Sequence, residues 1–297
     1  GFLLSFPRSL QAEIWGLLNV FAFWAGISRW VSVRKSSYWL TWVALLFCAV
    51  ELDISLRYQQ INALLTGLIL WGMADFRDGK AGKAAGWLAL ATNLKVVPAL
   101  FALPLFAIGR KRYNTRFLLQ SALFLVVPAL VLGWSKNQQA LESWYRAVTS
   151  DLGAAGILDL DSAMRRIGLP AIPGARLAIL VASAGLMITL CRRKILWGPW
   201  YTLGAGGLLL FSPRTESPTF VLFAPSYFFL AGNIQNLPRT QRRIAIGVFL
   251  LSGIALSLCF TDLWPRAIWD PAPWRQANKT FAVLALWILS IPLALRK

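Results

Sequence analysis

A single lysine interrupts the apolar stretch of residues 84–108, which otherwise carries only Thr92 and Asn93 as polar residues. A charge at the centre of a membrane helix costs at least ~2.5 kcal/mol on insertion scales, so it usually faces a cavity or a partner and marks function. Pro98 follows Lys95 closely, lacks a backbone N–H and disfavours helix in the residue before it. We therefore expect two short helices that meet at a functional Lys95. The alternative is a lysine that snorkels to the membrane interface.

Basic residues flank this stretch on both sides. Lys80 and Lys83 precede it, and Arg110, Lys111 and Arg112 follow it. Lys and Arg of short loops collect on the cytoplasmic side of a membrane. Both flanks therefore belong on the same side, and the segment must enter the membrane and return. Its tip then lies at membrane depth or near the external face.

Four groups of polar residues are expected on the external side, the first in a predicted polar turn over residues 51–62. The groups are Glu51, Asp53, Arg57, Gln60 and Asn62; Asn93 and Lys95; Asp159, Asp161, Arg165 and Arg166; and Arg214 and Glu216. Cations and amide donors beside a membrane cavity suit an anionic lipid headgroup, because Arg forks and the Lys point charge bind phosphate. Carboxylates could bind sugar hydroxyls or act as a general base. The alternative, ordinary solvated loop residues, is preferred for the third group only.

Other kinds of chemistry find little support in the sequence. It contains no histidine, so neither a His-ligated metal nor a His general base can come from this chain. Cys48, Cys191 and Cys259 lie in or at the ends of separate apolar runs without metal-ligand spacing, so buried structural thiols are expected. A Gly-rich nucleotide loop is also missing from the sequence, which disfavours a nucleotide ligand. We expect neither a metal nor a cofactor.

The composition is that of a membrane protein. Hydrophobic residues make up 57% of the chain, charged residues 14%, and the mean hydropathy is +0.58. Soluble domains carry about 25% charged residues. The polar residues cluster between apolar runs, which predicts an all-α, polytopic helical membrane protein and not a transmembrane β-barrel, whose strands alternate. The net charge of +18 comes from short basic clusters at helix ends that orient the helices, so we do not expect nucleic acid as a partner.

About eleven spans, including short broken helices, follow from the alternation of apolar runs and basic clusters. Several runs are shorter than the ~20 residues of a straight span. Short helices interrupted by Pro or Gly are tolerated where they border a cavity or pack on neighbours. The runs cover residues 14–27, 38–52, 62–74, 84–108, 117–134, 178–191, 200–211, 219–232, 244–260 and 280–295.

Residues 1–297 are expected to form a single transmembrane domain, because no repeat, low-complexity segment or soluble domain is visible. The long polar section, residues 135–175, is expected to be an external loop. Residues 139–149 within it are predicted to form a short amphipathic helix on the membrane surface. The side chains at helical spacing that would face the membrane are Leu141, Trp144, Tyr145 and Val148.

Three stretches, in this order and spacing, resemble glycosyltransferase family 87 of the GT-C superfamily, which comprises polyprenyl-phosphate-mannose-dependent mannosyltransferases and relatives. Residues 58–65 read YQQINALL and resemble the family's G-Q-x-N-x-hydrophobic stretch, with Gln59 where glycine is usual. Residues 85–98 read AGWLALATNLKVVP and resemble its signature A-G-x-x-x-(G/A)-x-A-x-x-x-K-x-x-P. Residues 210–216 read LFSPRTE and resemble its L-L-S-P-x-S-(W/E) motif. The resemblance covers most of residues 2–231.

The resemblance implies a GT-C-like fold and a hexosyltransferase of the cell envelope in the bacterial inner membrane. The implied reaction is inverting transfer of a sugar, mannose or another hexose, from a polyprenyl-phosphate-sugar donor to a lipid or glycan acceptor on the external face. A phosphate leaving group needs cations to stabilise its growing charge. The residues implied to bind donor phosphate or substrate are Lys95 and Arg214, then Arg57, with Gln60, Asn62 and Glu216 for headgroup or sugar.

The family's general base is an Asp in the first external loop, just after the first span. No acid of this chain matches it by motif. The alternation of spans places Gly1 outside, and Gly1 is neither a methionine nor part of a visible signal peptide. We therefore expect the first span and the catalytic Asp to precede Gly1, and the chain by itself to fold in part without transferring sugar.

Two other classes of function are also open from the residues. A transporter or lipid flippase would likewise place charges in a cavity, but such folds often contain paired broken helices in two halves. The sequence has one Lys-Pro break, at residues 95–98, and no second one that matches it. A purely structural membrane subunit is the third possibility.

Overall fold

Helices build the described part of the chain, as the apolar runs predicted. The computed structural model describes residues 7–31, 38–108, 111–152, 158–172, 174–192, 197–212, 215–258 and 273–295, and these contain no strand. The elements are α1 (Arg8–Val31), α2 (Tyr38–Arg57), α3 (Asn62–Arg77), α4 (Ala81–Leu94), α5 (Ala99–Ala107), α6 (Lys111–Leu132), α7 (Trp134–Leu152), α8 (Leu160–Arg166), α9 (Ala175–Arg192), α10 (Trp197–Phe211), the 3₁₀ helix η2 (Ser217–Leu222), α11 (Pro225–Ile234), α12 (Arg239–Leu258) and α13 (Pro273–Leu295).

Five of the described helices, α1, α2, α6, α9 and α13, are long and apolar enough to cross a membrane. The other predicted runs correspond largely to α3, α4, α5, α10, α11 and α12, most of which are shorter than the ~20 residues of a straight span. The run over residues 219–232 is divided between η2 and α11. The prediction of a polytopic helical membrane protein with short broken helices is confirmed.

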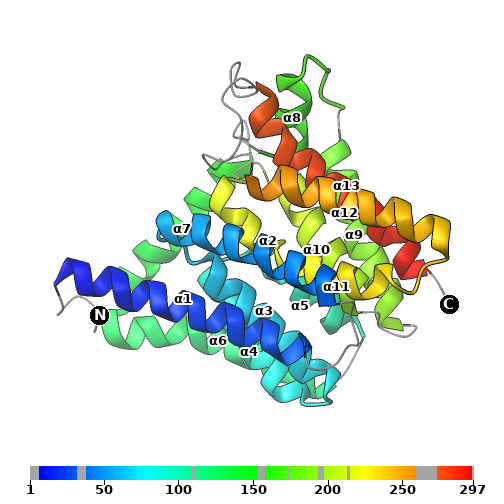
Figure 1. Cartoon of the computed structure of the whole chain (residues 1–297). Helices are drawn as coiled ribbons and strands as arrows, with labels where there is room; N and C mark the ends of the chain where they lie inside the picture. Colours follow the sequence, from blue (N-terminus) through cyan, green and yellow to red (C-terminus); the bar gives the residue numbers. More distant parts are fainter. Residues whose placement is uncertain are drawn as a thin grey trace.

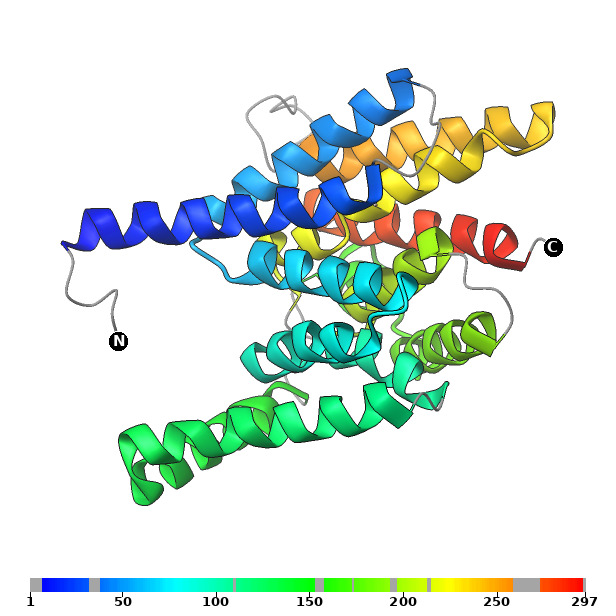
Figure 2. The same ribbon diagram turned by 90° about the horizontal axis from the view of Figure 1, so that it is seen from below.

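The helices pack in two groups that meet at the centre of the molecule (Figures 1 and 2). In the first group α1 packs on α3, α3 on α4, and α4 on α6. In the second group α9 packs on α10, α10 on α13, and α13 on α12. Helix α2, together with η2 and α11, and the short helix α5 connect the two groups. Lys95, between α4 and α5, lies at this junction.

Small residues allow α1 and α3 to approach closely. A Cβ added at Gly67 of α3 would collide with the backbone of Ala22 in α1, and one added at Gly26 would lie 2.9 Å from the Cα of Gly67. Helices in membranes gain much of their association from such van der Waals contact between small residues. The close crossing fixes the position of α3, whose first residue is Asn62.

The break at Lys95 is present as predicted. Helix α4 ends at Leu94, Lys95 is extended with φ −155° and ψ 137°, and α5 begins after Pro98. Helix α5 has nine residues, which corresponds to about 14 Å at 1.5 Å per residue and is far less than a membrane thickness. The chain therefore turns back at Lys95, which places this side chain at the junction between the two groups of helices.

The polar turn is shorter than the predicted range of residues 51–62, so the predicted extent is wrong. Helix α2 continues through the polar residues to Arg57, and the turn contains only residues 58–61. Glu51 is fully buried and pairs with Lys279 of α13, at 2.9 Å between Nζ and Oε1. Because this partner lies 228 residues away, a local pattern of polar residues could not distinguish a buried carboxylate from a loop carboxylate.

The section over residues 135–175 contains two helices. The expected amphipathic helix is longer than predicted, since α7 covers Trp134–Leu152. Asp159 caps the N-terminus of α8 through Ser162 N, and Arg176 pairs with Asp161 at 2.7 Å. Asp159 is itself fully buried. The expectation of ordinary solvated loop residues is therefore wrong for Asp159, and Asp161, Arg165 and Arg166 belong to helix α8.

The basic ends of the first helices are joined by ion pairs. Arg29 of α1 pairs with Asp75 at 3.0 Å and with Asp78 at 3.1 Å, at the end of α3. Trp87 Nε1 of α4 donates to the same Asp75 at 3.0 Å.

The two free cysteines among the described residues, Cys48 and Cys191, are buried as expected, and Cys259 lies outside the described residues.

Candidate functional site

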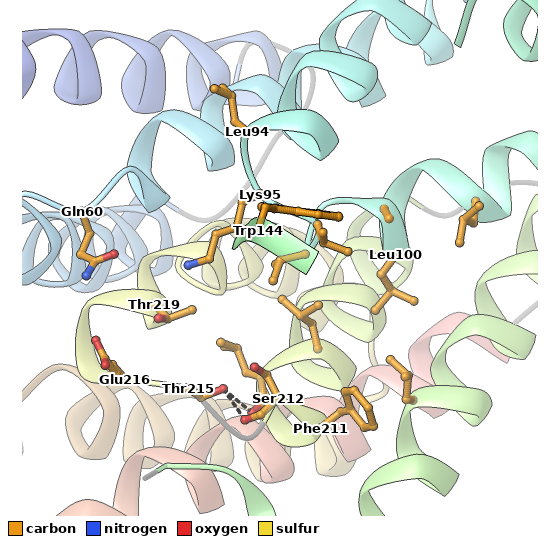
Figure 3. Close-up of a pocket in the computed structure, with 17 residues that line it drawn as sticks. Gln60, Leu94, Lys95, Leu100, Trp144, Phe211, Ser212, Thr215, Glu216 and Thr219 are labelled. Atoms are coloured by element: carbon orange, nitrogen blue, oxygen red, sulfur yellow. Dashed lines mark hydrogen bonds between the residues drawn. The ribbon is translucent and has the colours of Figure 1, made fainter. Parts of the chain in front are cut away.

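A cavity of about 680 Å³ lies where the α4–α5 break faces α10 and the segment that leads into η2. Figure 3 shows its polar side chains on one wall, with the Lys95 amino group directed towards Gln60 and Thr219. The opposite wall is apolar. The polar lining residues are Gln60, Lys95, Ser212, Thr215, Glu216 and Thr219, and the apolar ones include Leu100, Leu103, Leu180, Leu208 and Phe211.

Lys95 is held in place by a neutral partner. Its Nζ donates to Oδ1 of Asn62 at 3.0 Å, and Nδ2 of Asn62 donates to the carbonyl oxygen of Pro218 at 3.3 Å. Asn62 is fully buried, whereas Lys95 is half-buried and lines the cavity. Asn62 therefore orients the ammonium group without neutralising it, and the charge stays available to a ligand in the cavity.

Glu216 supplies the carboxylate on this wall, and it is the one acid among the described residues that line the cavity. Its charge acts on Lys95, but no described carboxylate lies within the 4.0 Å of an ion pair with that lysine. An ammonium group and a separate carboxylate facing one cavity can bind an anionic group and hydroxyl groups side by side.

Gln60 reaches the cavity because of the turn that ends α2. Gln60 N donates to Ser55 O and Gln59 N donates to Leu56 O, which is the Schellman pattern of hydrogen bonds. Gln59 occupies the left-handed position of this motif with φ +51°, where glycine is usual. The turn expected at this position is thus present without glycine, and Trp15 Nε1 donates to its Gln59 carbonyl at 3.1 Å.

The two arginines expected at the site have different outcomes. Arg57 does not line the cavity; it is exposed and pairs with Asp53 of its own helix at 2.8 Å. Arg214 lies outside the described residues, although Ser212 and Thr215 on either side of it line the cavity. The roles of both arginines in phosphate binding stay predictions.

Sequence reasoning missed several lining residues. Thr215 belongs to the quoted motif, and its Oγ1 lies 3.0 Å from the carbonyl oxygens of both Ser212 and Leu209 (Figure 3 draws the bond to Ser212). Thr219 lies just after the motif. Trp144 was predicted to face a membrane from α7, yet it also lines the cavity. Helical spacing identified the face of Trp144 but could not show what that face meets.

The cavity suits an amphiphile with an anionic head. A cation, an amide, hydroxyls and a carboxylate gather at one wall, and aliphatic side chains of α5, α9 and α10 form the other. Among the described residues, no three His, Cys, Asp or Glu side chains gather closely enough to hold a metal ion. The described polar side chains that line the cavity supply ammonium, amide, hydroxyl and carboxylate groups.

Comparison with known proteins gives a family for this arrangement. The model of glycosyltransferase family 87 matches residues 2–213, which is more than half of the chain and includes Gln60, Asn62 and Lys95. Glu216 and Lys279 lie beyond the matched residues. Neither the search of curated proteins nor the search of solved structures gave a significant match. The match over residues 2–213 shows that the chain belongs to glycosyltransferase family 87, and so that it is a membrane glycosyltransferase.

Proposed function

We propose that this glycosyltransferase transfers a hexose, with mannose as the first candidate, from a polyprenyl-phosphate sugar to a lipid or glycan acceptor. The external face of a bacterial plasma membrane is the proposed location. The observation that carries the proposal is the cavity, which combines the Lys95 ammonium group with a wall of aliphatic side chains. A nucleotide-sugar donor would have no use for such a wall.

The proposed reaction is a displacement at the anomeric carbon of the sugar. An acceptor hydroxyl oxygen forms a bond to this carbon while the bond to the phosphate oxygen breaks, and the hydroxyl proton passes to a general base. The polyprenyl phosphate leaves with an additional negative charge. Preorganised cations and donors stabilise such growing charge strongly in a water-poor site. We assign this role to Lys95, oriented by Asn62 at 3.0 Å.

The other polar lining residues are assigned to the sugar. Glu216, Gln60 and Thr219 line the same wall as Lys95 and supply carboxylate, amide and hydroxyl groups. Hydroxyl-rich ligands are recognised by such a small set of placed acceptors and donors. We keep Arg214 as a second candidate phosphate ligand on the strength of its motif, and Arg57 as a third.

The apolar wall is assigned to the prenyl chain. Leu100 and Leu103 come from α5, Leu180 comes from α9, and Leu208 comes from α10. Leu103 is 59% exposed, so the wall continues to the outer surface of the helices, where lipid would lie. A donor anchored in the membrane could then reach Lys95 without leaving the bilayer.

Family membership does not favour the transporter or flippase alternative.

A transfer assay tests the proposal directly. Membranes that contain the full-length protein, including the segment expected to precede Gly1, would receive either radiolabelled polyprenyl-phosphate mannose or radiolabelled GDP-mannose, with membranes containing its Lys95→Met variant as the matched control. We expect label to enter a lipid or glycan product from the polyprenyl donor alone, and only with the unmodified protein. Equal transfer from GDP-mannose in membranes free of polyprenyl phosphate would overturn the assigned donor class.

A further inference from the structure

The protein interior holds an ion pair that the proposed reaction does not use. Glu51 of α2 and Lys279 of α13 are both fully buried, and Nζ lies 2.9 and 3.1 Å from the two carboxylate oxygens. Desolvating two charges is costly, and a buried pair is often no more stabilising than apolar residues of equal volume. Stability alone therefore gives little reason to keep this pair. The better-attested role of a buried ion pair is to favour one packing arrangement of the helices over others.

The pair lies against η2, the segment that carries part of the cavity wall. Nζ of Lys279 is 5.1 Å from the ring centroid of Phe220, a geometry in which the ring face attracts the cation. Phe220 is a fully buried residue of η2. The same short element places Thr219 in the cavity, and Glu216 directly precedes it. Movement of Phe220 would thus move two lining residues.

From η2 the contacts continue to Lys95. The carbonyl oxygen of Pro218 in η2 accepts the hydrogen bond from Nδ2 of Asn62 at 3.3 Å. Oδ1 of Asn62 in turn accepts from Nζ of Lys95 at 3.0 Å. The amide of Asn62 cannot turn over without breaking both bonds. Where η2 lies therefore decides where Asn62 holds the ammonium group.

We propose that Glu51 and Lys279 are positioning residues: their buried pair fixes η2 against α2 and α3, and so sets the place of Lys95 and Glu216 in the cavity. Nothing in the family match assigns this role, because Lys279 lies beyond the matched residues. The proposal rests on the proposed function only in taking Lys95 to be the phosphate ligand. A pair that merely clamps α13 to α2 would leave η2 and the cavity unchanged when it is neutralised.

The test uses a variant that removes both charges and keeps the side-chain sizes, Glu51→Gln with Lys279→Met. The control is Arg29→Gln with Asp75→Asn, which neutralises the pair at the basic ends of α1 and α3, away from η2. Three readouts are taken in detergent: thermal unfolding, amide hydrogen exchange of residues 215–224, and binding of farnesyl phosphate as a short prenyl phosphate. We expect a similar unfolding temperature, exchange in 215–224 at least 5-fold faster, and affinity 5–10-fold weaker. The control should match the wild type in exchange and affinity.

Unchanged exchange over residues 215–224 in a folded double variant would overturn the positioning role. If the wild type binds no farnesyl phosphate while exchange still accelerates in the variant, the donor class fails and the positioning role stands. Should the double variant not fold, Phe220→Leu decides, because it keeps the ion pair and removes the ring. We then expect faster exchange in the same segment and weaker binding, and no change in either would refute the proposal.

Discussion

The ammonium group of Lys95 donates to the neutral amide of Asn62. Because this partner carries no charge, it does not neutralise the lysine. A carboxylate partner at the same distance would stabilise the lysine and at the same time compete with an anionic ligand. An amide fixes the direction of the side chain and leaves the full charge for the ligand. In the proposed function, binding of the donor phosphate offsets the cost of this charge in a membrane protein.

The first prediction concerns this charge. In the full-length protein, Lys95→Met should insert and fold, because it removes a charge from the membrane, but should lower the transfer rate at saturating donor about 10²–10³-fold, as the loss of one transition-state donor does. Lys95→Arg should restore only part of the rate, since a planar guanidinium does not occupy the place of a compact ammonium. Initial rates in membranes with equal protein content are the measurement. Near-normal turnover of Lys95→Met would show that Lys95 only snorkels.

A second residue-scale prediction uses Asp78, in the turn between α3 and α4. The hydrogen bond from Arg77 is the largest effect and holds the pKa of Asp78 below its ordinary value of 3.8; burial opposes it, and the charges of Arg77, Arg29 and Lys80 lower the pKa further. A carboxyl whose pKa is lowered on folding stabilises the fold above its unfolded pKa, and loses that contribution as the pH falls through the folded pKa.

Asp78→Asn should therefore lower the unfolding temperature in detergent at pH 7, by a small amount because pairs this exposed contribute only ~0–1 kcal/mol. The difference between variant and wild type should begin to shrink as the pH falls below 3.8, because the pKa of Asp78 in the folded protein lies below that value. Unfolding scans of both proteins at pH 7 and pH 3 measure this. A difference as large at pH 3 as at pH 7 would mean that Asp78 acts by packing and not by charge.

At the scale of elements, the two turns that flank α3 use the same hydrogen-bond pattern with different residues. Gly79 N donates to Phe76 O and Lys80 N to Asp75 O after α3, as in the turn at Gln59. Gly79 has φ +77° and Gln59 has φ +51°. Left-handed backbone suits glycine and costs other residues roughly 1–2 kcal/mol. The turn that carries Gln60 to the cavity therefore stores strain that its counterpart lacks.

Exchanging these residues gives the third prediction. Gln59→Gly should stabilise the protein by about 1 kcal/mol and Gly79→Gln should destabilise it by a similar amount, because only the first substitution relieves left-handed strain. Thermal unfolding in detergent, with the wild type as reference, measures both. A lower unfolding temperature for Gln59→Gly would show that the Gln59 side chain makes a contribution larger than the strain.

At the scale of the whole molecule, polar and basic ends of the helices separate. The end of α2, the start of α3, the α4–α5 break and η2 meet at the cavity. The C-terminal ends of α1 and α3 are joined elsewhere, by the ion pairs of Arg29 with Asp75 and Asp78. Thr280 of α13 donates to the carbonyl of Leu158, which ties the segment before α8 to the cavity side. The positive-inside rule then assigns the basic ends to the cytoplasm.

The fourth prediction is this orientation. Single cysteines in a background without the native ones should react with an impermeant maleimide from the outside at Val96 and Arg165, and only after permeabilisation at Arg112. Val96 is the exposed labelling position next to Lys95. Arg165 is an exposed position in the helix that follows Asp159, which is itself buried. Arg193, also expected in the cytoplasm, lies outside the described residues. Labelling of Arg112→Cys and Arg165→Cys from the same side would contradict the hairpin at Lys95.

Much of this molecule follows from its sequence. Apolar runs and basic clusters predicted an all-helical membrane protein, because helix formation in a membrane depends on local apolarity and on backbone hydrogen bonds within one segment. Pro98 located the break at Lys95, since proline acts on its immediate neighbours. The motifs at residues 58–65 and 85–98 identified Gln60, Asn62 and Lys95 before any contact between them was known.

Tertiary structure decided which polar residues meet. Asn62 and Lys95 lie 33 residues apart, Glu51 and Lys279 lie 228 apart, and only the packing of α2, α3, α13 and η2 brings them together. Arg57 looked equivalent to its neighbours in sequence, yet it is not among the residues that line the cavity and pairs with Asp53. Periodicity gives the face of a helix on which a side chain lies, but the partner of that face depends on every helix that packs around it.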